Sequence, residues 1–205
     1  MARIDDYDNA KKITVAKLIE GEFKTIAEQS GLTFFDKDTI CIDFLDRIYR
    51  VKYPSFDFEA EAKGAKEVPL QEQVLILHYM LGCSDRKITG NWISYREIPG
   101  AAFYFSAFVQ RAIDPLKKVF GTNADRIGKP ARALKGTAIE AGDAGFEFSV
   151  LPKAPMQLIL WEGDDEFPAE ANIVFDKIVG EIFSPEDAVW LAGMLVYRLI
   201  AISYR

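Results

Sequence analysis

A β-hairpin is indicated by the stretch Leu151-Pro-Lys-Ala-Pro-Met-Gln-Leu-Ile-Leu-Trp-Glu-Gly-Asp-Asp-Glu-Phe-Pro-Ala-Glu-Ala-Asn-Ile-Val-Phe-Asp176. Within it, an apolar run over Met156–Trp161 precedes turn-forming Gly and Asp residues, and a second apolar run covers Ile173–Phe175. Short apolar runs bounded by turn formers are typical of buried strands. The stretch therefore predicts two neighbouring strands joined by an acidic turn.

Helices and strands alternate irregularly along the rest of the chain. Helical spacing of apolar residues predicts helices over residues 8–29, with Gly31 as the C-cap, and over residues 70–81. A further helix is predicted from residue 102, with Asp114-Pro115 starting a second helix that reaches residue 120, and residues 123–136 are helical in character with an interruption at 128–130. Runs rich in β-formers predict strands over residues 32–35, 39–45, 48–53, 91–95 and 146–150. Because there is no regular βαβ order, the pattern favours the α+β class, with a mainly antiparallel sheet packed against several helices.

The last helix has the clearest start signal in the sequence. Ser184 is placed as an N-cap, Pro185 as the first helical residue and Asp187 as the capping-box partner. The residues that follow are apolar nearly all round, so we expect a buried C-terminal helix. A length of 205 residues is enough for one globular domain with a sizeable core, and we expect a single domain over residues 1–205.

The charge of the chain is acidic but uneven. A net charge of −6 argues against a nucleic-acid binder, because phosphate backbones are bound mainly by basic surfaces. The segment Arg111–Lys135 holds seven basic and two acidic residues, a net +5, so the remainder sums to −11. This segment is either a patch for an anion or an acidic partner, or a solvated helical face.

Cysteine content and hydropathy restrict the cellular setting. Cys41 and Cys83 are far apart and form no Cys-x-x-Cys spacing, so we expect reduced thiols and no self-contained iron–sulfur cluster. The acidic N-terminus does not resemble a signal peptide. The most apolar segment, residues 188–202, is shorter than a membrane span and contains Arg198. We therefore expect a cytoplasmic protein with no membrane segment.

A ligand site is one interpretation of the block from Gly90 to Gly100, which combines Trp92, Tyr95 and Arg96. An arginine can clamp a carboxylate or phosphate, and an aromatic ring can stack on a planar ligand. The other interpretation is an arginine that ties loop carbonyls together beside an aromatic core.

His78 is the only histidine, and it lies at helical spacing from Val74 and Leu81. We include it among the candidate ligand-binding residues as an axial ligand or acid–base group, with a hydrogen-bonded core histidine as the alternative. The aromatic run of Phe103–Phe105 with Phe108 lines either a cofactor pocket or the core, and core is the commoner role of such a stripe. The identity of any cofactor stays unknown.

A divalent metal site is one interpretation of the carboxylates around the hairpin. Asp164, Asp165 and Glu166 lie in the turn, and Asp176 ends the second strand. Calcium and magnesium take oxygen ligands of this kind. The spacing does not match an EF-hand loop, and a solvated turn is the alternative interpretation, since Gly and Asp are turn formers in their own right.

Four segments together resemble an uncharacterised family, the domain of unknown function 3786 of anaerobic bacteria and archaea. They are Ile76–Leu81 with its His-Tyr pair, the block Gly90–Gly100, the stretch Leu151–Asp176 with Trp161-Glu-Gly-Asp-Asp-Glu-Phe-Pro168, and Ser184–Asp187. The resemblance implies a link to iron–sulfur proteins, since relatives are sometimes fused to, or encoded near, a four-cysteine domain. Any cluster would then belong to a partner. The resemblance carries over no catalytic residue.

Three hypotheses about function follow. The first is a ligand-binding or accessory protein of anaerobic metabolism that takes a small anionic or planar ligand, or an iron–sulfur or redox partner. The second is a metal-assisted enzyme that uses the acidic turn. The third is an interaction domain that docks another protein through its basic segment. Whether the protein is an enzyme stays open from the sequence.

Overall fold

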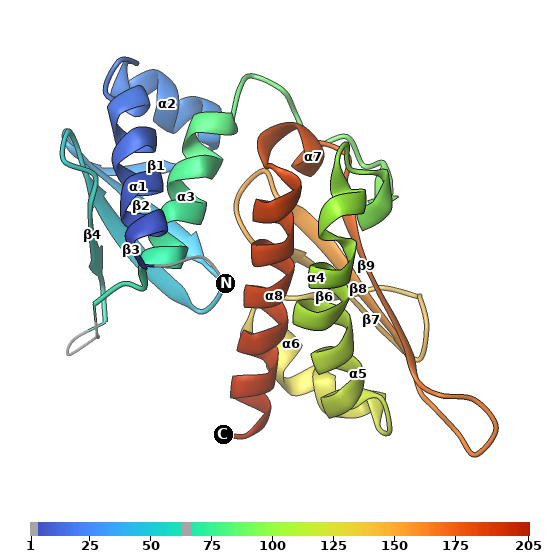
Figure 1. Ribbon diagram of the computed structural model, residues 1–205. Coiled ribbons are helices and arrows are strands. Elements are labelled where there is room, and N and C mark those ends of the chain that lie inside the picture. Colours follow the sequence, from blue (N-terminus) through green and yellow to red (C-terminus); the bar gives the residue numbers. More distant parts are fainter. Residues whose placement is uncertain (1–3, 63–66) are drawn as a thin grey trace. The chain divides into compact units, whose positions relative to one another are not determined.

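The computed structural model of the chain describes residues 4–62 and 67–205 and divides it into two compact units (Figure 1). The N-terminal unit runs to Lys87 and includes Leu151–Lys153, and the C-terminal unit comprises Ile88–Val150 and Ala154–Arg205. The single domain expected over residues 1–205 stays a prediction.

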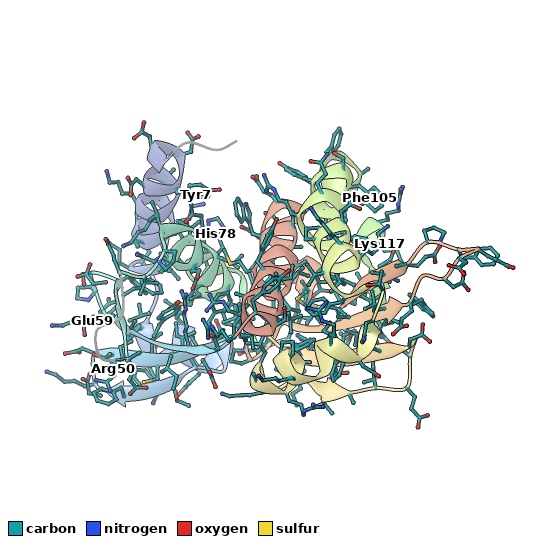
Figure 2. The ribbon with its side chains drawn as sticks, turned by 90° about the horizontal axis from the view of Figure 1, so that it is seen from below. Tyr7, Arg50, Glu59, His78, Phe105 and Lys117 are labelled. Carbon is teal, nitrogen blue, oxygen red and sulfur yellow. The ribbon has the colours of Figure 1, made fainter. Side chains whose placement is uncertain are left out.

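The N-terminal unit is a four-stranded antiparallel sheet with helices on one face (Figures 1 and 2). The strands, in the order β1-β2-β3-β4, are β1 (Thr33–Asp36), β2 (Thr39–Phe44), β3 (Arg47–Lys52) and β4 (Asp57–Ala60). The helices are α1 (Ile4–Leu18), α2 (Phe23–Ser30) and α3 (Leu70–Gly82). The β-forming runs predicted β1, β2 and β3, whereas no strand was predicted at β4.

Alternation along the strands of this unit separates a core face from an open face. Ile40, Ile42 and Phe44 of β2 are fully buried, and the residues between them are half-buried or exposed. On β3, Tyr49 and Val51 are buried in the same way. Side chains two residues apart share a face of a strand, so these five residues form the floor on which the helices pack.

The helix predicted over residues 8–29 is two helices in the structure. Its break falls at Gly21, between α1 and α2. Glycine in a helix interior costs about 1 kcal/mol relative to alanine. A continuous helix through Gly21 is therefore disfavoured, and the chain forms two separate helices that each pack in the unit. Gly31, expected as the C-cap, has a φ of +66° and donates its N–H to Ala27 and Glu28, as predicted.

The C-terminal unit is built on a five-stranded antiparallel sheet of order β5-β9-β8-β7-β6. Its strands are β5 (Trp92–Ser94), β6 (Thr137–Ala138), β7 (Ala144–Ser149), β8 (Pro155–Trp161) and β9 (Glu170–Asp176). Its helices are α4 (Phe105–Phe108), α5 (Asp114–Phe120), α6 (Gly128–Ala133), α7 (Val179–Ile182) and α8 (Pro185–Ser203). The predicted α+β class is confirmed.

The hairpin that the sequence indicated is β8–β9. Its register runs from Met156 opposite Phe175 to Trp161 opposite Glu170. Leu158 and Ile173 face each other and are fully buried. The turn between the strands extends outward as a long loop, drawn in orange (Figure 1).

The helical region predicted over residues 102–120 contains a π-helical turn, η3 (Val109–Ile113), between α4 and α5. Pro115 explains its position. Proline has no N–H to donate to the carbonyl four residues earlier, and its ring clashes with that carbonyl, so the helix widens just before it.

The C-terminal helix α8 begins with the capping box that the sequence predicted. The hydroxyl of Ser184 accepts the N–H of Asp187 at 3.1 Å, and the carboxylate of Asp187 accepts the N–H of Ser184 at 3.3 Å. Nine of the 19 residues of α8 are buried, whereas Tyr197 is 56% exposed. Among residues 4–62 and 67–205, no helix has the length and apolarity of a membrane span.

We predict that Ser184→Ala lowers the free energy of unfolding by about 1 kcal/mol, because it removes the acceptor for the N–H of Asp187. Urea denaturation measures the effect. Ser203→Ala is the matched control at the other end of α8, where the hydroxyl donates to a carbonyl that water can reach, and its cost should be below about 0.5 kcal/mol. Equal costs for the two variants would contradict the role of the capping box.

Candidate functional site

The block around Arg96 lies at the start of the C-terminal unit, and its aromatic residues have different environments. Tyr95 is 1% exposed, its hydroxyl donates to the carbonyl of Pro185 at 2.9 Å, and its ring stacks on Phe108 with 4.3 Å between centroids. Burial raises the pKa of Tyr95 to about 12, so the hydroxyl stays a donor. Tyr95 therefore anchors the beginning of α8 to the core.

Arg96 is exposed and places its guanidinium 3.6 Å from the centroid of the Phe105 ring. This cation–π contact holds the side chain against its own unit. Trp92 is half-buried on β5, where it pairs with Asp176 of β9. The structure thus groups Trp92, Tyr95 and Arg96 on one short segment, and their role in ligand binding stays a prediction.

His78 belongs to the N-terminal unit, whereas the Arg96 block belongs to the C-terminal unit. It lies half-buried in α3, between the buried residues Leu77 and Tyr79. Leu81, expected on the same face, is 40% exposed. A ligand role for His78 also stays a prediction.

Asp176 is fully buried and surrounded by hydrogen-bond donors from two segments. Its carboxylate accepts the N–H groups of Thr89, Gly90 and Ile178 at 3.0, 2.6 and 2.9 Å, and the hydroxyl of Thr89 at 2.8 Å. Burial alone would raise the pKa of Asp176, but these hydrogen bonds outweigh it and lower the pKa. The carboxylate is a structural tie that holds the Thr89–Gly90 segment against the end of β9.

The acidic turn is ordered by one of its own carboxylates. Asp164 accepts the N–H groups of Glu166 and Phe167 at 2.8 and 2.7 Å, which lowers its pKa. Asp165 and Glu166 are exposed. Because a strand rises about 3.3 Å per residue, the length of β9 separates this turn from Asp176 by roughly 20 Å. No group of three or more metal-ligating side chains is found among residues 4–62 and 67–205.

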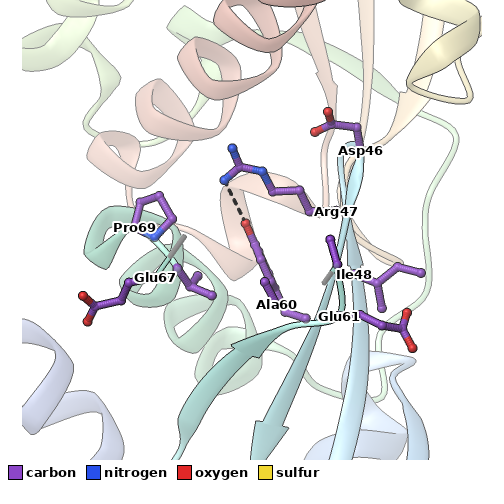
Figure 3. Close-up of a pocket in the computed structure, with 10 residues that line it drawn as sticks. Asp46, Arg47, Ile48, Ala60, Glu61, Glu67 and Pro69 are labelled. Carbon is purple, nitrogen blue, oxygen red and sulfur yellow. Dashed lines mark hydrogen bonds between the residues drawn. The ribbon is translucent and has the colours of Figure 1, made fainter. Parts of the chain in front are cut away.

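A pocket of about 600 Å³ in the N-terminal unit was not anticipated from the sequence (Figure 3). It is lined by residues 46–49 at the start of β3, residues 60–62 at the end of β4 and residues 67–69 before α3. Its volume falls in the range of small-molecule sites, and its lining is mostly apolar, as such sites usually are.

Three polar side chains form a hydrogen-bonded cluster beside this pocket. Arg47 donates through Nη1 to the hydroxyl of Tyr49 and to the carboxylate of Glu72, both at 3.1 Å. The hydroxyl of Tyr49 in turn donates to the other oxygen of Glu72. Tyr49 is 1% and Glu72 7% exposed. The cluster satisfies a buried carboxylate and fixes the arginine.

The titration behaviour of Tyr49 follows from this arrangement. Burial and the hydrogen bond to Glu72 raise the pKa of Tyr49 to about 12, and the hydrogen bond from Arg47 opposes them only in part. Tyr49 therefore keeps its proton at physiological pH. That proton is committed to Glu72, so the hydroxyl positions Arg47 and does not serve as a base.

The charged side chains around the pocket differ in direction. In Figure 3 the guanidinium of Arg47 points into the open space, whereas the carboxylates of Glu61 and Glu67 point away from it. Glu61 is paired with Arg50 at 2.8 Å. A ligand in the pocket would thus meet a cationic donor above an apolar wall.

One sequence signal of this site exists. Arg47 and Tyr49 are two residues apart, so a strand places both on the face that packs under the helices. An arginine at such an inward position requires a buried acceptor. Glu72, in the first turn of α3, is that acceptor, but its pairing with β3 is not visible without the tertiary structure.

Comparison with known proteins places the chain in one family. The family model described as "Domain of unknown function (DUF3786)" matches residues 22–198, so the chain belongs to this family. No curated protein and no solved structure matches the chain.

We predict that Asp176→Asn lowers the free energy of unfolding at pH 7 by about 2–3 kcal/mol, because an amide nitrogen would face N–H donors in a buried site. The loss should shrink as pH falls below about 4. The folded-state pKa of Asp176 is lowered, so its stabilisation is present above the unfolded pKa and is lost as pH falls through the folded pKa.

Urea denaturation of the wild type and Asp176→Asn at pH 7 and at pH 3.5 measures both effects. Asp165→Asn is the control, because this exposed carboxylate should change stability by less than about 0.5 kcal/mol. A destabilisation by Asp176→Asn that is the same at both pH values would show that the carboxylate charge is not what the donors stabilise.

Proposed function

We propose that this member of the DUF3786 family is a ligand-binding or accessory protein that takes a small carboxylate-bearing molecule in the pocket around Arg47. The observation that carries the proposal is the state of Arg47. Its side chain is 41% exposed, fixed from behind by Tyr49 and Glu72, and directed into the pocket (Figure 3).

The guanidinium has a free edge of the right shape for a carboxylate. Nη1 donates to Tyr49 and Glu72, and Asp46 acts on the guanidinium through its charge, so Nη2 and Nε are the groups offered to a ligand. These groups form a planar fork that matches two carboxylate oxygens. Holding the fork in advance reduces the entropy that binding would otherwise cost.

The apolar wall suits a ligand with a hydrocarbon body. Ile48, Val68 and Pro69 line the pocket beside Arg47, and Val68 is itself 4% exposed. Burying apolar ligand surface contributes about 25 cal/mol per Å². Because Glu72 neutralises Arg47, net attraction for an anion is weak, and affinity should depend on directed hydrogen bonds and apolar contact more than on salt.

Other parts of the functional hypothesis stay predictions. A redox or iron–sulfur partner is suggested by the family resemblance alone. A metal-assisted reaction at the acidic turn receives no support from the positions of Asp164, in the turn before β9, and Asp176, at the far end of that strand. Binding at Arg47 is favoured over acid–base chemistry there, because the proton of Tyr49 is already donated to Glu72.

We predict that hexanoate binds the full chain saturably and that hexan-1-ol, of equal chain length, binds at least tenfold more weakly. The alcohol cannot accept two hydrogen bonds from the guanidinium. Arg47→Lys should weaken hexanoate binding about tenfold, because a lysine keeps the charge near Glu72 but loses the planar fork. Saturation-transfer NMR titration measures all three affinities.

Arg50→Lys is the matched control, because Arg50 follows on the opposite face of β3 and pairs with Glu61. It should leave hexanoate affinity unchanged. Circular dichroism of each variant confirms that the fold is intact. Equal binding of hexanoate and hexan-1-ol by the wild type would reject the proposal without reliance on any variant.

A further inference from the structure

A second concave surface of the N-terminal unit combines aromatic rings with carboxylates. This groove has a volume of about 700 Å³ and lies between α2, β1 and the turn that follows β1, with Tyr53 at its side. It shares no lining residue with the Arg47 pocket. We propose that it binds a small organic cation of the alkylated ammonium type.

The aromatic wall of the groove presents rings in two orientations. Phe23 stacks on Tyr53, with centroids 4.7 Å apart and planes at 20°. Phe34 meets Phe23 edge-on, at 5.6 Å and 90°. Phe34 is 41% exposed and Tyr53 half-buried, so parts of both rings are open to a ligand. Tyr53 is nearly parallel to the buried Phe23, so the open rings of Tyr53 and Phe34 also stand at a steep angle, and two such rings can contact one cation from two sides, as in an aromatic cage.

The charges along the rim favour a cation. Two lysines line the groove, and each is paired: Lys24 with Glu28 at 3.9 Å and Lys37 with Asp38 at 3.5 Å. Glu22 and Asp36 line it as well, so the lining residues carry two more carboxylates than ammonium groups, although Lys52, outside the lining, also acts on Asp36 through its charge. A hydrogen bond from the N–H of Asp38 at 2.9 Å lowers the pKa of Asp36, so this carboxylate stays ionised well below neutral pH.

The same unit already uses this chemistry on the opposite face of β1. The guanidinium of Arg50 lies 3.8 Å from the centroid of Phe35. The register of β1 is irregular between Phe34 and Asp36, and the ring contacts show the two directions: Phe34 meets Phe23 of α2, whereas Phe35 meets Arg50 on the face of the sheet away from the helices. Phe35 thus has an internal cation, whereas Phe34 lines the groove next to the excess carboxylates.

An alkylated ammonium fits these features better than a metal ion or a simple ammonium. Its methyl groups spread the positive charge over an apolar surface. The cation is therefore weakly hydrated and loses little hydration free energy when it contacts aromatic rings. The groove supplies the apolar rings and, a short distance away, the countercharge. The carboxylates are exposed, so their contribution should fall as ionic strength rises.

The test uses choline as the probe and 3,3-dimethylbutan-1-ol as its uncharged analogue of the same shape, each titrated into the full chain at low ionic strength. Choline should bind saturably, with its N-methyl proton signal shifted upfield by the ring faces. The uncharged analogue should bind at least fivefold more weakly. No saturable choline shift, or equal binding of the two compounds, would overturn the proposal.

Variants on the two faces of β1 locate the site. Phe34→Leu should weaken choline binding about fivefold, and Phe35→Leu, its matched control, should leave it unchanged. Asp36→Asn removes the charge of an exposed side chain but keeps an oxygen that can accept the N–H of Asp38. It should weaken binding and reduce its salt dependence, which keeps the test decisive if Phe34→Leu does not fold. Loss of binding in Phe35→Leu but not in Phe34→Leu or Asp36→Asn would overturn the proposal.

Failure here and failure of carboxylate binding at Arg47 are distinguishable. Arg47→Lys should leave choline affinity unchanged, because Arg47 does not line the groove. A choline signal that disappears in Arg47→Lys would place the cation in the Arg47 pocket instead and overturn this assignment.

Discussion

The fold of each unit depends on one requirement, that a buried carboxylate be met by hydrogen-bond donors. Asp176 and Glu72 are the buried acidic residues of the described chain. An ionised group without partners in the interior would cost several kcal/mol, so the donors must be present wherever the chain buries such a group. Asp176 accepts hydrogen bonds from the backbone N–H groups of Thr89 and Gly90, which precede β5. These bonds hold β5 beside β9. Glu72 accepts hydrogen bonds from Tyr49 and Arg47, and these bonds join α3 to β3.

The same requirement separates structural carboxylates from functional groups. Asp176 has donors on both oxygens, and another ligand would have to displace them, which explains why a carboxylate that the sequence marked as a metal ligand acts as a tie in the structure. Both oxygens of Glu72 also accept hydrogen bonds, but one of the donors, Arg47, has a side chain long enough to reach the surface. The functional potential of the cluster therefore lies in Arg47, whose inner edge is bound and whose outer edge faces the pocket.

Features encoded by neighbouring residues could be predicted from the sequence, and features encoded by distant pairs could not. The β8–β9 hairpin, the capping box of Ser184 and the C-cap at Gly31 each depend on residues a few positions apart. The break near Gly21 and the π-helical turn before Pro115 have local causes too, but whether packing overrides a helix breaker is decided by the tertiary fold. The Arg47 pocket requires a contact across 25 residues, and Asp176 one across 87, so neither was accessible from spacing alone.

Burial also explains why the two concave surfaces of the N-terminal unit should select opposite ligands. In the Arg47 pocket the carboxylate of Glu72 is buried and the guanidinium is exposed, so the surface offers N–H donors to an acceptor. In the groove the rings form the wall and carboxylates outnumber ammonium groups among the lining residues, so the surface offers negative charge to a cation. Both surfaces belong to one sheet and lie beside its helices, because Phe34 of β1 contacts Phe23 of α2 and Tyr49 of β3 donates to Glu72 of α3. The net charge of this unit does not predict either ligand preference, since each preference depends on which charged side chains the fold exposes at that surface.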